Sequence, residues 1–199
     1  MIKLIIFDLG GVVFTNGTKN FAKYLSEKYQ KDFEETYNFL NYSDIGNGYR
    51  EGKITRNGFW KKAKEELQLK EEVDELEKIW INCYDLITET KNIILQLKNK
   101  YKLFYLSDNV RERVDALDKK YYFLEWFDDG IFSHDIGVRK PNPRIYELTL
   151  KKAQVRPEEA IFIDDKESSL PPAQNLGIKT ILFTSPEQLR KDLKNFGAL

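Results

Sequence analysis

The sequence predicts an α/β fold in which a parallel sheet forms the core and a helical segment is inserted near the start of the chain. Two observations predict it. Short apolar runs alternate with helical patterns along most of the chain, as in parallel sheets that helices cover on both faces. One early stretch of about 75 residues breaks this alternation and contains helical patterns alone.

Four apolar runs are predicted to be strands. The first is rich in isoleucine and ends at Asp8, which is typical of a strand buried on both faces. The predicted strands are 2–7, 102–106, 160–163 and 178–183. Apolar residues at helical spacing predict helices near 93–97, 110–117, 145–153 and 189–193. Together these elements describe a Rossmann-like core.

The interrupting stretch, 16–90, is predicted to be a cap of four helices, while 1–15 and 91–199 form the Rossmann-like core. Thr18, Asp32 and Thr55 each precede an apolar stripe, so they are expected to cap helix N-termini. The turns between the helices are expected at Gly46, Gly48, Gly52 and Gly58. Because the insertion follows the first strand, we expect the cap to lie over the carboxyl end of the sheet, where open α/β sheets bind ligands.

Composition excludes several classes of protein. Lysine plus arginine number 32 and aspartate plus glutamate number 32, so the chain lacks the basic excess of a nucleic-acid-binding protein. With 41% hydrophobic and 32% charged residues, it is neither a disordered chain nor a membrane protein. Cys83 is the only cysteine, which favours a cytoplasmic protein without disulfides, and the sequence leaves open a monomer or a homodimer.

Acidic side chains stand at the ends of predicted strands. Asp8 follows the first strand, and Asp164 and Asp165 follow the third. The carboxyl ends of parallel strands converge on one crevice, so these carboxylates would repel each other there unless a cation neutralised them. A hard divalent cation with a preference for oxygen ligands fits this need, and Mg²⁺ is therefore expected.

Groups suited to an anion are expected in the same crevice. Ser107 follows the second strand, and the helix after Asn109 would present its positive N-terminal end. The amides around Gly10 and Gly11 would donate hydrogen bonds. Lys140, in the connection before the third strand, adds a positive charge. The combination predicts a site for a phosphoryl group beside Mg²⁺, with a carboxylate placed to attack phosphorus.

The chain resembles the haloacid dehalogenase-like superfamily of phosphatases. Four motifs match in order across the whole chain: 7–12 (FDLGGV), 106–109 (LSDN), 137–141 (GVRKP) and 162–165 (FIDD). Each motif alone is weak, but four in order at strand ends are highly specific. The segment 161–165 with 175–178 is most similar to the N-terminal phosphatase domain of soluble epoxide hydrolases and to bacterial sugar-1-phosphate phosphatases.

This resemblance implies roles for individual residues. Asp8 would attack phosphorus and form an aspartyl-phosphate, Ser107 would hold the phosphoryl oxygens, and Lys140 would neutralise charge. Asp164 and Asp165 would hold Mg²⁺ together with Asp8 and the backbone carbonyl of Gly10, and Asp165 would be the more direct ligand of the pair. Gly10, Gly11, Ser107, Asp108 and Asn109 would surround the substrate. A small phosphorylated metabolite is the implied substrate.

Two positions depart from the superfamily pattern. Most of these phosphatases carry a second aspartate where this chain has Gly10, and that residue protonates the leaving oxygen and then activates water. Its absence predicts slow turnover or a preference for good leaving groups such as sugar 1-phosphates. Asp108 stands where asparagine is commoner, and a role in proton transfer is one interpretation of it.

Two other functions stay open at this level. A weakened module that binds phosphate without turnover would explain Gly10. A 2-haloacid dehalogenase would also use Asp8 as nucleophile, without metal, although Asp164 and Asp165 would repel its anionic substrate. Residues outside the motifs have simpler interpretations: Trp60, Trp80 and Cys83 are expected to pack in the cap, and His134 is expected to be structural.

Overall fold

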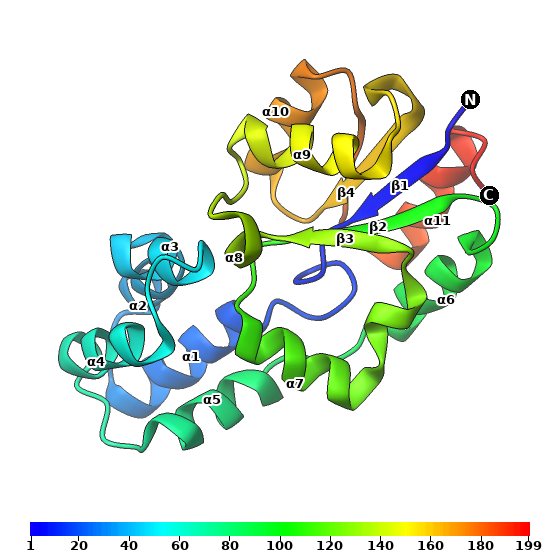
Figure 1. The fold of residues 1–199 in the computed structure, drawn as a ribbon. Coiled ribbons are helices and arrows are strands. Elements are labelled where there is room, and N and C mark those ends of the chain that lie inside the picture. The colour runs from blue at the N-terminus through cyan, green and yellow to red at the C-terminus, as the bar shows by residue number, and fades with distance from the viewer.

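The computed structural model describes residues 1–199 and has a five-stranded parallel sheet at its centre (Figure 1). The strand order is β3-β2-β1-β4-β5. The strands are β1 Leu4–Phe7, β2 Lys102–Ser107, β3 Asp129–Phe132, β4 Ala160–Asp164 and β5 Lys179–Leu182. The predicted parallel α/β fold is confirmed.

Alternate residues of β1 enter two hydrophobic cores, one on each face of the sheet. Leu4 and Ile6 pack with α9 and α10, whereas Ile5 and Phe7 pack with the opposite layer of helices. A strand with helices on both faces must be apolar at every position. The residues of β1 are therefore apolar without interruption, and do not alternate between apolar and polar. The core helices are α6 Thr88–Leu97, α7 Arg111–Tyr121, α8 Ser133–Ile136, α9 Pro143–Ala153, α10 Leu170–Asn175 and α11 Pro186–Asn195, with short 3₁₀ segments at Phe123–Trp126, Pro157–Glu159 and Glu167–Ser169.

One strand, β3, was not predicted from the sequence. It begins with Asp129 and Gly130, and both residue types are depleted in strands. A Cβ atom at Gly130 would lie 2.3 Å from Cδ2 of Tyr105, so glycine lets the neighbouring tyrosine ring lie against the backbone. Close packing, rather than local preference, therefore accounts for this edge strand.

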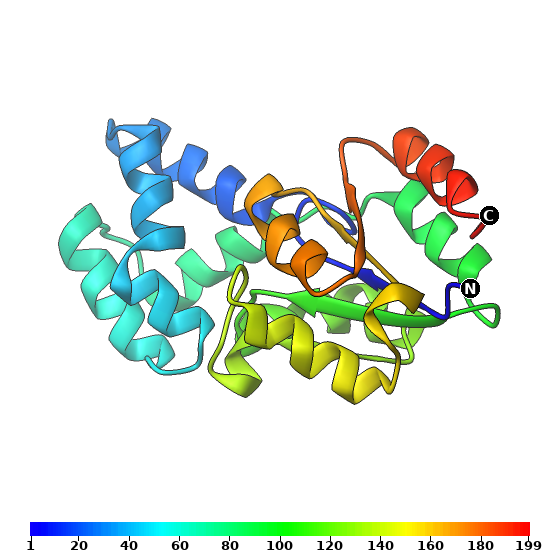
Figure 2. The same ribbon diagram turned by 90° about the horizontal axis from the view of Figure 1, so that it is seen from above.

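Five helices, not four, separate β1 from α6, and they lie together beyond the carboxyl ends of the strands (Figures 1 and 2). They are α1 Gly17–Tyr29, α2 Phe33–Tyr42, α3 Asp44–Arg50, α4 Arg56–Leu67 and α5 Val73–Asn82. We refer to residues 17–82 as the helical segment. No helix of the chain is both long and apolar enough to cross a membrane.

The N-terminal caps of this segment were mostly predicted. The side chains of Asp32 and Thr55 accept hydrogen bonds from the amides of Glu35 and Gly58, as expected. The prediction for α1 was wrong, because Asn16 rather than Thr18 caps that helix and accepts from the amide of Lys19. Both residue types are good caps, so two candidates two residues apart cannot be ranked by sequence alone.

The extra helix, α3, runs through two glycines that were predicted to be turns. Ser43 caps it, and Gly46 and Gly48 lie inside it. A Cβ atom at Gly46 would approach the carbonyl oxygen of Leu40 to 2.6 Å, and one at Gly48 would approach Cδ1 of Ile54 to 2.5 Å. These glycines permit close packing within the helical segment.

The other two glycines divide between a turn and a helix. Gly52 lies in a turn, with φ of +67°, as predicted. Gly58 lies inside α4, so the turn prediction for this residue was wrong.

Aromatic side chains fill the interior of the helical segment. Trp60 and Trp80 are fully buried, with ring centroids 5.7 Å apart at 85°. Phe21 stacks on Trp80 at 4.6 Å. Such pairs stabilise a core beyond the area they bury. The two tryptophans thus have the packing role expected of them, whereas Cys83 follows α5 and is only partly buried.

Candidate active site

The predicted site residues converge at the carboxyl edge of the three central strands. Asp8 follows β1, Ser107 ends β2 and Asp164 ends β4, and these strands are hydrogen-bonded neighbours. They enclose a small cavity of about 40 Å³ beneath the helical segment. Its lining comprises Asp8, Gly10, Asn16, Thr18, Asn41, Arg50, Tyr84, Ser107, Asp108, Asn109, Lys140 and Lys166. A volume of this size holds roughly three water molecules.

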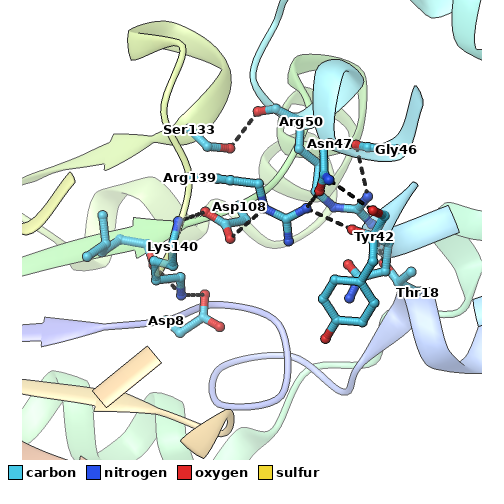
Figure 3. A network of polar contacts seen from close by, with 12 residues as sticks. Asp8, Thr18, Tyr42, Gly46, Asn47, Arg50, Asp108, Ser133, Arg139 and Lys140 are labelled. Carbon is cyan, nitrogen blue, oxygen red and sulfur yellow. Dashed lines mark hydrogen bonds and ion pairs between the residues drawn. The ribbon is translucent and has the colours of Figure 1, made fainter. Parts of the chain in front are cut away.

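Lys140 is the central cation of the site. Its Nζ lies 3.0 Å from Oδ1 of Asp8 and 2.6 Å from Oδ2 of Asp164, and it donates to the carbonyl oxygen of Leu106 at 3.1 Å (Figure 3). Burial lowers the pKa of Lys140, but Asp164 and Asp8 raise it more, so the pKa lies well above its usual value. Lys140 therefore remains charged and holds two carboxylates together.

Asp8 has one occupied and one available carboxylate oxygen. Its Oδ1 accepts from the amide of Leu9 at 2.7 Å and contacts Lys140, whereas Oδ2 has no hydrogen-bond donor in the chain. Burial raises the pKa of Asp8 to about 8, Lys140 lowers it, and Asp164 and Asp165 raise it. The carboxylate is thus fixed in orientation and needs a further positive charge to be fully ionised at neutral pH.

The residues fit a divalent cation. One carboxylate oxygen from each of Asp8, Asp164 and Asp165 lies within 4.8 Å of the others. Both oxygens of Asp164 are engaged, since Oδ1 accepts from the amide of Lys166 at 2.8 Å and Oδ2 contacts Lys140. In contrast, Oδ1 of Asp165 is buried without a partner. Burial and the neighbouring Asp164 raise the pKa of Asp165. An orphaned buried carboxylate oxygen is costly, and a metal ion would satisfy it.

Gly11 holds the loop after β1 against Asp165. Its φ is +90°, and a Cβ atom there would lie 2.1 Å from Oδ2 of Asp165. We expect Gly11→Ala to displace the Asp165 carboxylate and weaken Mg²⁺ binding at least about tenfold, because the added methyl group occupies the position of a ligand oxygen. Isothermal titration with Mg²⁺ measures this.

Gly197→Ala is the matched control for that variant. Gly197 also has a positive φ, of +68°, but nothing lies within 4 Å of its Cβ position. The control carries the same kind of backbone strain without the clash, so it should bind Mg²⁺ like the unmodified chain. Equal affinities for Gly11→Ala and the control would show that Asp165 does not bind the metal.

The motif at the end of β2 has a fixed geometry. Asp108 accepts from the amide of Lys140 at 3.1 Å and from Nε of Arg139 at 3.3 Å, so it holds the loop that carries Lys140. The side chain of Asn109 accepts from the amide of Val110, and the backbone carbonyl oxygen of Asn109 pairs with Nδ1 of His134 at 2.6 Å. Asp108 thus contacts the loop that carries Lys140, and His134 contacts the backbone at Asn109.

Sequence reasoning missed the part of the lining that comes from the helical segment. Thr18, Asn41 and Arg50 reach the cavity from α1, α2 and α3. Arg139, from the core, joins the two parts: its Nη1 donates to the carbonyl oxygen of Asn41 at 2.7 Å and also contacts Asn47 (Figure 3). No motif marks these residues in the sequence, and only their burial around a shared cavity identifies them.

Two arginines of α7, Arg111 and Arg113, do not reach this cavity. Arg111 pairs with Asp135 at 2.6 Å on the surface. Arg113 is buried, with its guanidinium 3.6 Å above the ring of Trp80 and its Nε 3.9 Å from Glu77. Arg113 thus packs α7 against α5.

Comparisons with known proteins agree with this geometry. A model of the haloacid dehalogenase-like hydrolases matches residues 2–197. A D-ribitol-5-phosphate phosphatase from Bacteroides thetaiotaomicron is 23% identical and covers 97% of both chains. The bifunctional epoxide hydrolase 2 of Rattus norvegicus is 37% identical over 34% of this chain and 12% of its own length. A crystal structure of a Bacteroides thetaiotaomicron enzyme of this family, with magnesium and inorganic phosphate, is similar with a TM-score of 0.77 at 24% identity, covering 92% of this chain and 95% of that one.

These matches confirm the resemblance drawn from the four motifs, and the family match extends over both the sheet and the helical segment. The chain belongs to the haloacid dehalogenase-like family of hydrolases.

Proposed function

We propose that this hydrolase is a Mg²⁺-dependent phosphatase that cleaves a small cytoplasmic phosphomonoester through an aspartyl-phosphate on Asp8. The observation that carries the proposal is the asymmetry of the Asp8 carboxylate. Leu9 and Lys140 fix Oδ1, while Oδ2 has no donor and Asp8 lines the cavity. A carboxylate held in this way is arranged for nucleophilic attack.

The residues around Asp8 fit the successive steps. Oδ2 attacks phosphorus, the bond from phosphorus to the leaving oxygen breaks, and that oxygen takes its proton from solvent. Lys140 offsets the negative charge on Asp8, and Ser107 donates a hydrogen bond to a phosphoryl oxygen. Water then attacks phosphorus, and the bond to Asp8 breaks, which releases inorganic phosphate and restores the carboxylate.

Asp8, Asp165 and the carbonyl of Gly10 would hold Mg²⁺, with Asp164 placed between the metal and Lys140. When bound, the ion would neutralise charge on the phosphoryl group. The orphaned oxygen of Asp165 supports this assignment, and so does the magnesium in the related structure from Bacteroides thetaiotaomicron. The D-ribitol 5-phosphate in the name of the related phosphatase supports a small metabolite as substrate.

The helical segment acts as the cap in this proposal. It supplies Thr18, Asn41 and Arg50 to the cavity and excludes bulk water from it. The cavity is smaller than most ligand sites, so the cap must move away from the sheet to admit substrate. We take 17–82 as its extent, because α6 packs with the core after it.

The first test is hydrolysis of p-nitrophenyl phosphate, whose leaving group needs little protonation. We expect turnover with Mg²⁺ and at least a hundredfold loss, on the order of several kcal/mol of transition-state stabilisation, when EDTA removes the metal. Re-addition of Mg²⁺ should restore the rate. Equal rates with Mg²⁺ and with EDTA would contradict the metal assignment, and no turnover from folded protein would favour a phosphate-binding module.

Gly10→Asp tests the missing acid. A Cβ atom at Gly10 would be 4.0 Å from its nearest neighbour, Cε1 of Tyr84, and its φ lies outside the left-handed region, so the backbone accepts a side chain. We expect the added carboxyl group to raise kcat for alkyl phosphates by up to about 10²–10⁴-fold, the typical gain from general acid–base catalysis. p-Nitrophenyl phosphate should gain much less. An unchanged rate for alkyl phosphates would show that protonation of the leaving group is not what limits the unmodified chain.

A further inference from the structure

Arg50 is a buried cation in the active-site cavity that has no anionic partner. It ends α3, is 3% exposed and lines the cavity that holds Asp8. Its Nη1 donates to the carbonyl oxygens of Leu40 and Gly46, at 2.6 and 3.3 Å, and its Nη2 lies 3.3 Å from Oγ1 of Thr18. All three acceptors are neutral. The Nε–H and one N–H of Nη2 have no acceptor in the chain.

The other charges around the cavity have partners of opposite sign. Lys140 is shared by Asp8 and Asp164, and Asp108 pairs with Arg139. Lys166 is the exception: it has no ion pair, and its Nζ lies 5.9 Å from the ring centroid of Tyr42. The cations nearest Arg50 are repulsive: burial lowers the pKa of Arg50 to about 9, and Arg139 and Arg113 add to this effect. Tyr84 and Asp108 raise the pKa, but each by less than the two arginines lower it. Arg50 keeps its charge at neutral pH, and no carboxylate pairs with it directly.

A purely structural role explains only part of this arrangement. Arg50 does satisfy the carbonyl oxygens of Leu40 and Gly46 at the junction of α2 and α3. A neutral amide side chain would satisfy carbonyl oxygens without the cost of burying an uncompensated charge. The position of the guanidinium on the cavity wall gives that charge a use, because an anion entering the cavity would pair with it.

We propose that Arg50 binds a second anionic group of the substrate, at the end of the molecule opposite the scissile phosphate. This proposal rests on the proposed phosphatase function and specifies its substrate class: a small phosphomonoester that also carries a carboxylate or a second phosphate. In Figure 3 Asp8 and Lys140 approach from loops of the core and Arg50 from the cap, so the two binding positions lie on different walls.

The experiment compares matched substrates that differ only in the second charge. 2-Phosphoglycolate is paired with 2-hydroxyethyl phosphate, 3-phosphoglycerate with glycerol 3-phosphate, and 6-phosphogluconate with glucitol 6-phosphate. A fourth pair, fructose 1,6-bisphosphate and fructose 6-phosphate, tests a second phosphate in place of a carboxylate. kcat/KM is measured with Mg²⁺ for the unmodified chain, Arg50→Gln and Arg50→Lys.

In the unmodified chain, we expect the member with the second anionic group to be preferred in at least one pair by about 10- to 100-fold, the usual effect of a charge-assisted hydrogen bond. Arg50→Gln should abolish that preference by raising KM for the anionic member, and Arg50→Lys should restore part of it. Arg111→Gln, which removes an exposed cation outside the cavity, should keep the preference. The pair with the largest preference identifies a carboxylate or a phosphate as the second group.

Other results would overturn the assignment. A preference in every pair for the member without the second anionic group would do so. An equal loss for both members in Arg50→Gln would also do so, because it would indicate a structural role alone. If the unmodified chain hydrolyses no phosphomonoester, including p-nitrophenyl phosphate, the proposed function fails separately. Calorimetric binding of the same pairs to the unmodified and Arg50→Gln proteins then decides the Arg50 proposal: a preference for the anionic member that disappears in the variant supports it, and the lack of one refutes it.

Discussion

Asp8→Asn is expected to lower kcat for p-nitrophenyl phosphate by about 10⁴-fold or more, because the neutral amide cannot attack phosphorus. The substitution keeps the size and shape of the side chain. Stability should not fall, since burial raises the pKa of Asp8 to about 8 and the carboxylate stands beside Asp164 and Asp165. At pH above 8 the neutral amide removes a buried negative charge, so the melting temperature in EDTA should be equal to or above that of the unmodified chain.

Asp115→Asn is the matched control for this prediction. It makes the same chemical change on the exposed face of α7, and its kinetics should equal those of the unmodified chain. A stopped assay of phosphate release, together with thermal melts, measures both properties. Substantial Mg²⁺-dependent turnover by folded Asp8→Asn would mean that another group attacks phosphorus, and the mechanism would have to be rebuilt without an aspartyl-phosphate.

Lys140→Met is expected to reduce both activity and stability. Removing the cation leaves Asp8 and Asp164 buried without compensation, and loss of one partner of a buried pair costs about 3–5 kcal/mol. For a chain of this size that corresponds to a fall in melting temperature of roughly 6–20 °C in EDTA. Without Lys140 the pKa of Asp8 rises further above its usual value, so the deficit should grow as pH increases. The loss of charge stabilisation should lower kcat by about 10²–10³-fold.

The chain offers a close control in Lys152→Met. Nζ of Lys152 lies 2.6 Å from Oδ1 of Asp129, the same distance that separates Lys140 from Asp164. In contrast to that buried pair, the side chains of Lys152 and Asp129 are both 44% exposed. Exposed pairs contribute about 0–1 kcal/mol, so this variant should melt near the unmodified chain. Mg²⁺ should recover part of the stability of Lys140→Met, because it supplies positive charge to the same carboxylates. A melting temperature unaffected by Lys140→Met in EDTA would contradict the role of Lys140 as the central cation.

The core of the site could be predicted because its residues are tied to strand ends. Asp8, Ser107 and Asp164 each follow or end a strand whose continuous apolar run is visible in the sequence. Parallel pairing then brings these ends together, whatever the details of packing. The site residues of the helical segment do not stand at strand ends, so the same reasoning does not place them. Arg50 belongs to a helix that contains two glycines and was expected to be a turn, and its place in the cavity depends on how α3 packs against α2 and the core.

The sequence by itself therefore determined the α/β sheet, the order of the motifs and the set of carboxylates beside a lysine, because hydrophobic periodicity and strand-end residues are local signals. Only the tertiary structure decided which oxygen of Asp8 has no donor, which aspartate keeps an orphaned oxygen, and where the charge of Arg50 lies. Those features arise from burial and from contacts between residues far apart in the chain. Such contacts set the local electrostatics, and no periodicity in the sequence encodes them.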